Sequence, residues 1–127
     1  IATAGSGRSR PELEGVVGTL VNTLLLRLDL GRCTDVRSLL ARAREVSSDA
    51  QALEELPFER LVAALKPERS PGREPLFQAM LLFDHRPPTA PLSPELTACR
   101  LDLPLGTSLC DLTLTVVDEG ALRVSFE

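Results

Sequence analysis

The chain has 127 residues and a net charge of −4, and apolar residues make up 43% of it while charged residues make up 25%. This length suits one modest domain or part of a larger one, and this composition is typical of a globular chain rather than a disordered one. The negative net charge gives no electrostatic reason to expect nucleic acid or an anionic membrane as a partner.

Membrane insertion, secretion and disulfide bonding are not indicated. The longest apolar run, Val16 to Leu26, is shorter than the roughly 20 residues needed to cross a bilayer, and no signal peptide precedes it. Cys33, Cys99 and Cys110 form no C-x-x-C pair, so we expect reduced, buried thiols in a cytoplasmic protein. The chain starts at Ile1 and ends within a strand-like segment, so we expect a piece of a longer polypeptide.

The first 28 residues are expected to hold two strands joined by a loop and a short helix. Gly5, Gly7 and Pro11 mark a loop after a short opening strand, and Pro11 suits the first turn of a helix over Glu12 to Val17. Leu20 to Leu28 is rich in apolar residues and indicates a buried strand, although periodicity alone leaves a longer helix open.

Asn22 interrupts this apolar run. A buried amide without hydrogen-bond partners costs about 1–3 kcal/mol, so the side chain needs a partner wherever it lies. Either Asn22 hydrogen-bonds a neighbouring loop, or it faces something that the protein handles. The residues themselves leave both interpretations open.

Two amphipathic helices are predicted next. Thr34 is a suitable N-cap, with Asp35 in the first turn, for a helix of about five turns. Its apolar face recurs at three- and four-residue spacing: Val36, Leu39, Leu40, Ala43, Val46, Ala50 and Leu53. Pro57 opens a second helix, and Pro67 ends it. The apolar face of this second helix comprises Phe58, Leu61, Val62 and Leu65.

The second half of the chain is expected to form strands. A polar connector, Pro67 to Pro75, leads to Leu76–Phe83, which is apolar at nearly every position, as in a strand covered on both faces. After the loop HRPPTAPLSP, Leu96–Leu103 alternates weakly. Leu112–Val117 and Leu122–Phe126 flank the letters DEG and indicate a β-hairpin. The sequence thus predicts a mixed α/β chain of the α+β type.

The residue types show no self-contained catalytic apparatus. His85 is the only histidine, and its neighbour Asp84 would point to the opposite face of a strand, which favours a solvated histidine over a catalytic one. The cysteines lack the ligand spacing of a zinc site, so no metal site is expected. The letters GSGRSR (Gly5 to Arg10) lack the spacing of a phosphate-binding loop and favour a turn with two surface arginines.

Two groups of charged residues leave alternatives open. Glu54, Glu55 and Glu59 would suit paired acids, but near a helix–helix junction they are more simply explained by the N-terminus of the second helix. Arg69 and Arg73 carry several fixed donors, which suit either a phosphate or carboxylates that pin the connector in place.

Four stretches, in order, resemble segments of nonribosomal peptide synthetase condensation domains. GRSRPELEGVVGTLVNTLLLR is similar to A-G-R-x-x-P-E-L-E-x-x-x-G-F-F-V-N-T-x-x-x-R, and ALEELPFERLVAALKPERS to A-H-Q-D-x-P-F-E-x-L-V-x-x-L-x-P-x-R-D. GREPLFQAMLLF is similar to S-R-x-P-L-F-Q-V-M-F, and CDLTLTVVDEGALRVSFE to the F-D-L-T-L hairpin. The matching positions include Asn22, Thr23, Arg27, Pro57, Phe58, Glu59, Arg73, Pro75 and Leu76.

The resemblance implies a partial chloramphenicol-acetyltransferase-like lobe over residues 1–127, with a mixed sheet packed against two or three helices. In the family, two such lobes enclose a tunnel where an acceptor amine attacks a carrier-bound thioester to form an amide. It implies that Asn22 and Thr23 are substrate-tunnel residues. The remaining matching positions would be structural: Arg27, Pro57, Phe58, Glu59, Arg73, Pro75 and Leu76.

The family's active-site motif, H-H-x-x-x-D-G, belongs to the N-terminal lobe and has no counterpart here. The resemblance therefore places no catalytic residue in this chain, which alone is expected to be inactive. No cofactor is expected on the chain itself, and phosphopantetheine is expected on partner carrier proteins. The other implied partners are the N-terminal lobe of the same domain and a neighbouring adenylation domain.

The sequence departs from the family pattern in several places. Leu53, Glu54 and Glu55 replace H-Q-D, and Thr19 and Leu20 replace two phenylalanines. Two alternatives therefore stay open. One is a non-catalytic binding module that contacts carrier or neighbouring domains. The other is a segment of a related acyltransferase, epimerisation or heterocyclisation domain.

Overall fold

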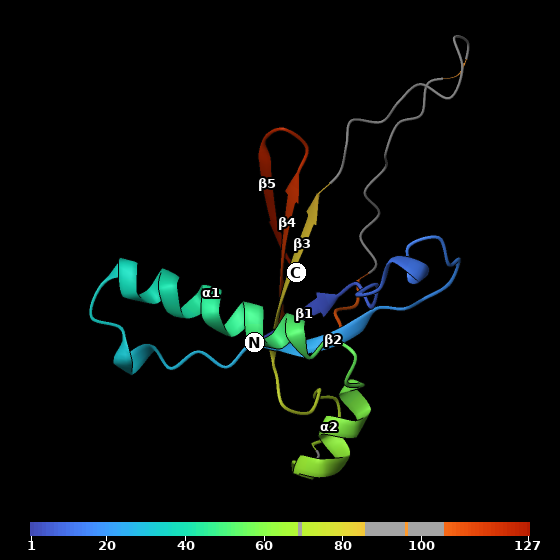
Figure 1. The fold of residues 1–127 in the computed structure, drawn as a ribbon. Coiled ribbons are helices and arrows are strands. Elements are labelled where there is room, and N and C mark those ends of the chain that lie inside the picture. Colours follow the sequence, from blue (N-terminus) through green and yellow to red (C-terminus); the bar gives the residue numbers. More distant parts are fainter. Residues whose placement is uncertain (69, 86–95, 97–105) are drawn as a thin grey trace.

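A computed structural model of the chain describes residues 1–68, 70–85, 96 and 106–127. In these residues five strands form one mixed sheet in the order β2-β1-β3-β4-β5 (Figure 1). The strands are β1 (Ala2–Gly5), β2 (Asn22–Leu25), β3 (Ala79–His85), β4 (Leu112–Asp118) and β5 (Leu122–Phe126). The outer pairs β1–β2 and β4–β5 are antiparallel, and β3 runs parallel to both β1 and β4. The expected mixed α/β class is confirmed.

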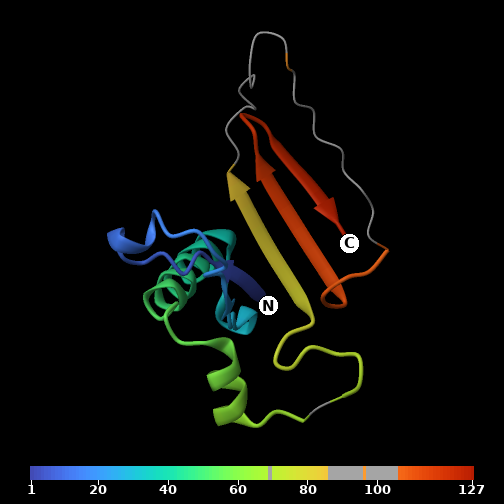
Figure 2. The same cartoon turned by 90° about the vertical axis from the view of Figure 1, so that its right-hand side faces the viewer.

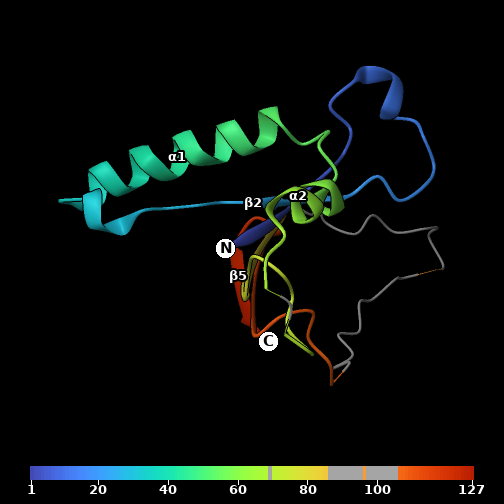
Figure 3. The ribbon, with the colours of Figure 1, turned by 90° about the horizontal axis from the view of Figure 1, so that it is seen from below.

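Two α-helices, α1 (Val36–Ala52) and α2 (Phe58–Leu65), follow β2 in the chain and both contact it. Short 3₁₀ turns span Pro11–Leu13 and Leu30–Arg32. Figure 2 shows both α-helices at the β1–β2 end of the sheet, and Figure 3 shows α1 running alongside β2. The helices that were expected to pack on the sheet therefore cover one end of it.

The apolar core is small, and its residues come from β1, β2 and β4 and from the segments next to β2 and β3. In the described residues its buried apolar side chains are Ala2, Leu24, Leu26, Phe77 and Val117. The ring of Phe77 meets the ring of Phe58 edge to face, with 5.8 Å between centroids, which ties α2 to the segment before β3. Burying a large apolar side chain contributes about 1.5–3 kcal/mol, so these few residues matter for holding the helices in place.

One face of β3, β4 and β5 is apolar and open. The strand register pairs Phe83 with Val116 and Val116 with Val124, and it places Phe126 beside Leu114. The side chains of Phe83, Val124 and Phe126 are 64%, 51% and 69% exposed. We call this surface the open apolar face; it consists of Leu81, Phe83, Leu114, Val116, Leu122, Val124 and Phe126.

The structure corrects the predicted bounds of the helices. The helix expected over Glu12 to Val17 is only a 3₁₀ turn at Pro11–Leu13, and the glycine at position 15 disfavours its continuation. Asp35, not Thr34, is the N-cap of α1, because the Asp35 carboxylate accepts from the Ser38 N–H and the Ser38 hydroxyl bonds back to Asp35.

The strands also differ in extent from the prediction. β2 covers four residues of the expected run from Leu20 to Leu28. β3 starts three residues after Leu76, because Leu76 has a left-handed φ of 72° that cannot continue a strand. The strand was expected to be covered on both faces, which is wrong at Phe83. The β4–β5 hairpin is confirmed, whereas Leu96–Leu103 lies outside the described residues apart from Leu96.

Candidate functional site

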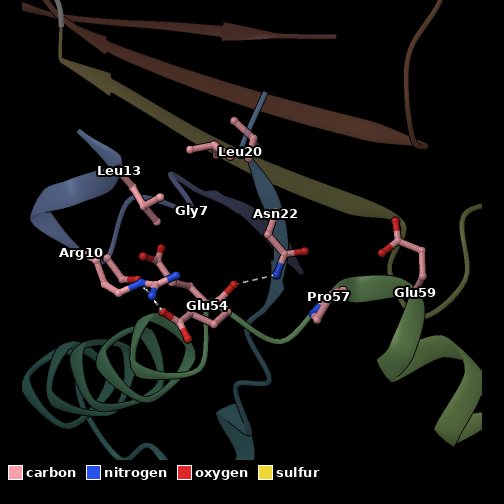
Figure 4. Close-up of a pocket in the computed structure, with 11 residues that line it drawn as sticks. Gly7, Arg10, Leu13, Leu20, Asn22, Glu54, Pro57 and Glu59 are labelled. Atoms are coloured by element: carbon pink, nitrogen blue, oxygen red, sulfur yellow. Dashed lines mark hydrogen bonds and ion pairs between the residues drawn. The ribbon is translucent and has the colours of Figure 1, made fainter. Parts of the chain in front are cut away.

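A cleft of about 450 Å³ lies between the β1–β2 loop and the segment that joins α1 to α2 (Figure 4). The β1–β2 loop supplies one wall, the joining segment and the start of α2 supply the other, and Asn22 lies between them at the start of β2. The eleven lining residues are Gly7, Ser9, Arg10, Leu13, Leu20, Val21, Asn22, Glu54, Glu55, Pro57 and Glu59.

Asn22 fastens β2 to the segment between the two α-helices. Its Nδ2 donates to the carbonyl of Glu54 at 2.8 Å and to that of Leu56 at 2.7 Å. Its Oδ1 accepts from the N–H of Phe58 at 3.1 Å. Pro57, the N-cap of α2, makes no side-chain capping bond, so Asn22 satisfies a helix donor that otherwise has no partner within the helix.

The Asn22 amide therefore uses both N–H donors and its oxygen on neighbouring backbone. This geometry fits the interpretation that Asn22 hydrogen-bonds a neighbouring loop. Asn22 also lines the cleft, and it holds the segment that forms the opposite wall.

Thr23, the second expected tunnel residue, lies on the other side of β2. The register places Asn22 opposite Gly5 and Thr23 opposite Ala4, and successive strand residues point to opposite faces. Thr23 is half-buried and is not among the residues that line the cleft. The structure thus separates the two neighbours that the resemblance grouped together.

Polar side chains bridge the two walls of the cleft at Glu55. The Ser9 hydroxyl donates to Glu55 Oε1 at 2.9 Å, and Arg10 Nε lies 3.6 Å from the same oxygen. The Arg10 and Glu55 side chains are 66% and 68% exposed, so solvent screens this ion pair. Glu59 lies in the first turn of α2, where a carboxylate favours the helix N-terminus as expected.

Arg8 is not the surface arginine that the sequence suggested. It is half-buried, and its guanidinium donates to the carbonyls of Leu13, Val16 and Gly18 within the β1–β2 loop. Its role was missed because backbone carbonyls, unlike carboxylates, have no signature in the sequence. The sequence does show a glycine just before Arg8. The structure explains it, because Gly7 has a φ of 65° and a Cβ there would lie 1.8 Å from the Leu20 carbonyl oxygen.

Two residues of the later motifs lie where other parts of the chain meet. Arg73 Nη2 lies 2.8 Å from Asp111 Oδ2, so Arg73 pins the connector to a carboxylate, one of the two uses left open. Pro75 precedes Leu76, whose left-handed backbone turns the chain so that Phe77 enters the core. Arg27 is exposed, and Arg69 lies outside the described residues.

Of the candidate chemical groups, the structure describes His85, Cys33 and Cys110, and these three lie apart from one another in the sequence and join no shared cluster among the described residues. His85 ends β3 with a side chain that is 73% exposed, and its Nδ1 lies 3.4 Å from Asp118 Oδ2. Cys33 and Cys110 are free thiols, half-buried rather than buried as expected, and Cys99 lies outside the described residues. Among the residues that the structure describes, no cluster of three His, Cys, Asp or Glu side chains would hold a metal ion. In the same part of the chain, no helix combines the length and apolarity needed to cross a membrane.

Comparisons with known proteins agree with the motifs. A sequence profile of the condensation domain matches residues 1–127. One of the linear gramicidin synthase proteins of Brevibacillus parabrevis is 38% identical over 120 residues, which cover 93% of this chain and 2% of that protein. The dimodular nonribosomal peptide synthase of Bacillus subtilis (strain 168) is 39% identical over 114 residues, which cover 90% of this chain and 5% of that protein. The chain belongs to the condensation-domain family.

A solved structure shares the fold. A chain in the complex of the X-domain and OxyB from teicoplanin biosynthesis matches with a TM-score of 0.72 at 21% identity, over 97% of this chain and 27% of that chain. The present chain therefore spans a small part of the proteins that it matches. The fold, the motif contacts and the profile match are mutually consistent.

Proposed function

We propose that this chain is part of the C-terminal lobe of a condensation domain in a nonribosomal peptide synthetase. The whole domain would join carrier-bound acyl or aminoacyl thioesters through an amide bond. The supporting relatives are synthetases, and the profile match runs over residues 1–127.

The observation that carries the proposal is the meeting of three motif segments that lie far apart in the sequence. Asn22, from the V-N-T segment, accepts from the N–H of Phe58, in the P-F-E segment. The Phe58 ring contacts Phe77, in the P-L-F-Q segment. The residues that match the family thus build one continuous support for the wall of the cleft, which explains why they occur together.

The chemistry requires groups that this chain does not contain. The acceptor amine attacks the thioester carbonyl, a C–N bond forms, the C–S bond breaks, and the carrier thiol leaves with a proton. A positioned histidine would assist this step and would come from the H-H-x-x-x-D-G motif of the N-terminal lobe. The present chain would shape the acceptor-side wall, with Asn22 holding the segment from Glu54 to Phe58.

The proposed partners follow from this reaction. They are the N-terminal lobe of the same domain, peptidyl or acyl carrier proteins bearing phosphopantetheine, and a neighbouring adenylation domain. A cytoplasmic location is proposed as well, and the free thiols of Cys33 and Cys110 support it.

The experiment is amide formation by the condensation domain that carries this chain, supplied with loaded donor and acceptor carriers and followed by mass spectrometry. We expect the amide on the acceptor carrier, and its loss when the second histidine of the H-H-x-x-x-D-G motif is changed to alanine. Carrier binding without product from the unaltered domain would contradict the proposal and favour the non-catalytic binding module.

A further inference from the structure

The β1–β2 loop, residues 6–21, is tied together by one side chain. Arg8 Nη1 donates to the carbonyls of Leu13 and Val16, and Nη2 donates to that of Gly18 at 3.3 Å. A guanidinium suits this task because its donors are fixed in one plane and reach several acceptors at once. Arg8 therefore connects the start of the loop to three points along its length.

The far part of this loop has few other long-range restraints, and its backbone makes only local turn hydrogen bonds, such as Val16 N–H to the carbonyl of Leu13. The side chains of Val16 and Val17 are 42% and 101% exposed, so apolar packing does not anchor the tip. A Cβ added at Gly15 would meet no atom within 4 Å, so the neighbouring structure does not press on the loop there. The three carbonyl contacts of Arg8 thus add, to these local turns, the side-chain restraint that links residues 13–18 to the start of the loop.

The same loop forms more than half of the lining of the cleft, including Gly7, Ser9, Arg10 and Leu13. Arg8 itself is not a lining residue, so it acts on the cleft through its neighbours. The carbonyl of Leu13, a lining residue, is one of its acceptors. The hydroxyl of Ser9, next to Arg8 in the chain, bonds Glu55 on the opposite wall.

We propose that Arg8 is a positioning residue that holds the β1–β2 loop as a preformed wall of the cleft and thereby sets the affinity of the cleft for the acceptor substrate. The substrate part of this statement rests on the proposed function. Without Arg8, the loop samples other conformations. The apparent affinity for the acceptor then falls in proportion to the fraction of molecules whose loop keeps the binding-competent conformation.

This role predicts a particular kinetic pattern. If the competent fraction falls to about one tenth, KM for the acceptor carrier rises about tenfold, while kcat is unchanged because the reacting groups lie elsewhere. A variant that merely lowers the amount of folded protein shows the opposite pattern, a lower kcat at unchanged KM. The split between KM and kcat therefore separates positioning from general stability.

The test compares Arg8→Gln, Arg8→Lys and the control Arg32→Gln in the condensation domain that carries this chain. Arg32 is an exposed arginine that pairs with Asp29 at another turn, so the control removes the same charge without touching the loop. Hydrogen exchange is followed at the amides of Leu13, Glu14 and Val16, which bond to carbonyls within the loop. Acceptor KM and kcat are measured in parallel.

For Arg8→Gln we expect exchange about tenfold faster at these amides and KM about tenfold higher at constant kcat. Arg8→Lys should fall between wild type and Arg8→Gln, because an ammonium reaches fewer of the carbonyls, and Arg32→Gln should match wild type. Unchanged exchange, or a fall in kcat at unchanged KM, overturns the proposal. If Arg8→Gln does not fold, Arg8→Lys carries the same test.

Failure of the proposed function is distinguishable from failure of this inference. A wild-type domain that makes no amide contradicts the function, while the exchange data still decide whether Arg8 holds the loop. A wild-type domain that makes amide, together with an unaltered loop in Arg8→Gln, contradicts the inference alone.

Discussion

The two ends of the sheet are stabilised by different means. At the β1–β2 end, Arg8 and Asn22 make six hydrogen bonds to the backbone of neighbouring segments. At the β4–β5 end, the strands pair with one another through their backbones, while Val124 and Phe126 of the open apolar face stay half or more exposed. The first end is held mainly by side-chain contacts to the backbone. The second is held mainly by strand pairing, together with buried Val117 and exposed ion pairs such as His85–Asp118.

This difference between the two ends indicates which part of the structure is fixed by contacts within the chain itself. Side chains that saturate backbone groups fix the cleft from within, since each lost partner leaves an unsatisfied donor or acceptor. A sheet face that is apolar and exposed normally packs against a further layer of structure. The cleft should therefore respond sharply to substitutions, and the open apolar face should respond weakly in the chain alone.

The largest effect is expected at Gly7. In Gly7→Ala the new Cβ would lie 1.8 Å from the Leu20 carbonyl oxygen, and the φ of 65° strains any residue with a side chain. The backbone must move apart, and we expect a loss of about 3–4 kcal/mol in the free energy of unfolding of the condensation domain. Urea denaturation measures it.

Gly15→Ala is the matched control in the same loop. A Cβ there meets no atom within 4 Å, and Gly15 does not have a positive φ. The change should be neutral or should stabilise the domain by up to about 1 kcal/mol, because alanine restricts the unfolded chain. Equal losses of stability for the two variants would show that replacing either glycine carries the same general cost. That outcome would contradict a specific close approach at Gly7.

The next largest effect is expected at Asn22. Asn22→Ala removes the partners of two carbonyls and of the Phe58 N–H, and should cost about 1–3 kcal/mol. Asn22→Asp keeps the acceptor for Phe58 but turns an oxygen toward the carbonyls of Glu54 and Leu56. At pH 7, Asn22→Asp should lower the free energy of unfolding by at least as much as Asn22→Ala, although aspartate has the shape of asparagine.

The pH dependence tests this explanation directly. Two facing carbonyls raise the pKa of the carboxyl introduced by Asn22→Asp, and its protonated form donates a hydrogen bond to one of them. The folded state therefore binds the proton more tightly than the unfolded state, and stability is regained as the pH falls through the raised pKa. Denaturation of Asn22→Asp relative to Asn22→Ala, between pH 7 and pH 4, measures the recovery. A stability difference between the two variants that stays constant across this range would contradict the two carbonyl contacts of Asn22, of which Figure 4 draws the one to Glu54.

Sequence patterns predict the local elements of this chain better than its long-range contacts. The three- and four-residue spacing from Val36 onward defined α1 almost to its ends, and the turn letters DEG located the hairpin. For Asn22, the need for a partner was predictable, but the partner was not, since Glu54 and Phe58 are 32 and 36 residues away.

Two further features have weaker signals in the sequence. The contacts of Arg8 are local, yet they end on carbonyl oxygens, which every residue has. A left-handed backbone at Leu76 runs against the preference of a bulky residue, so pattern reading extended β3 through it. Both depend on the packed structure around them, which propensities and periodicity do not contain.

The smallest effect on stability is expected on the open apolar face. Phe126 is 69% exposed, so Phe126→Ser should change the free energy of unfolding of the 127-residue chain by less than about 0.5 kcal/mol. Its effect should appear in association instead, because exposed apolar side chains on an edge strand promote contact between copies. Sedimentation velocity over a concentration series should show less self-association for Phe126→Ser than for Arg123→Ser, which alters the opposite face of β5. Equal self-association of the two variants would mean that the open apolar face does not promote contact between copies of the chain. The two ends of the sheet would then differ only in how substitutions affect stability.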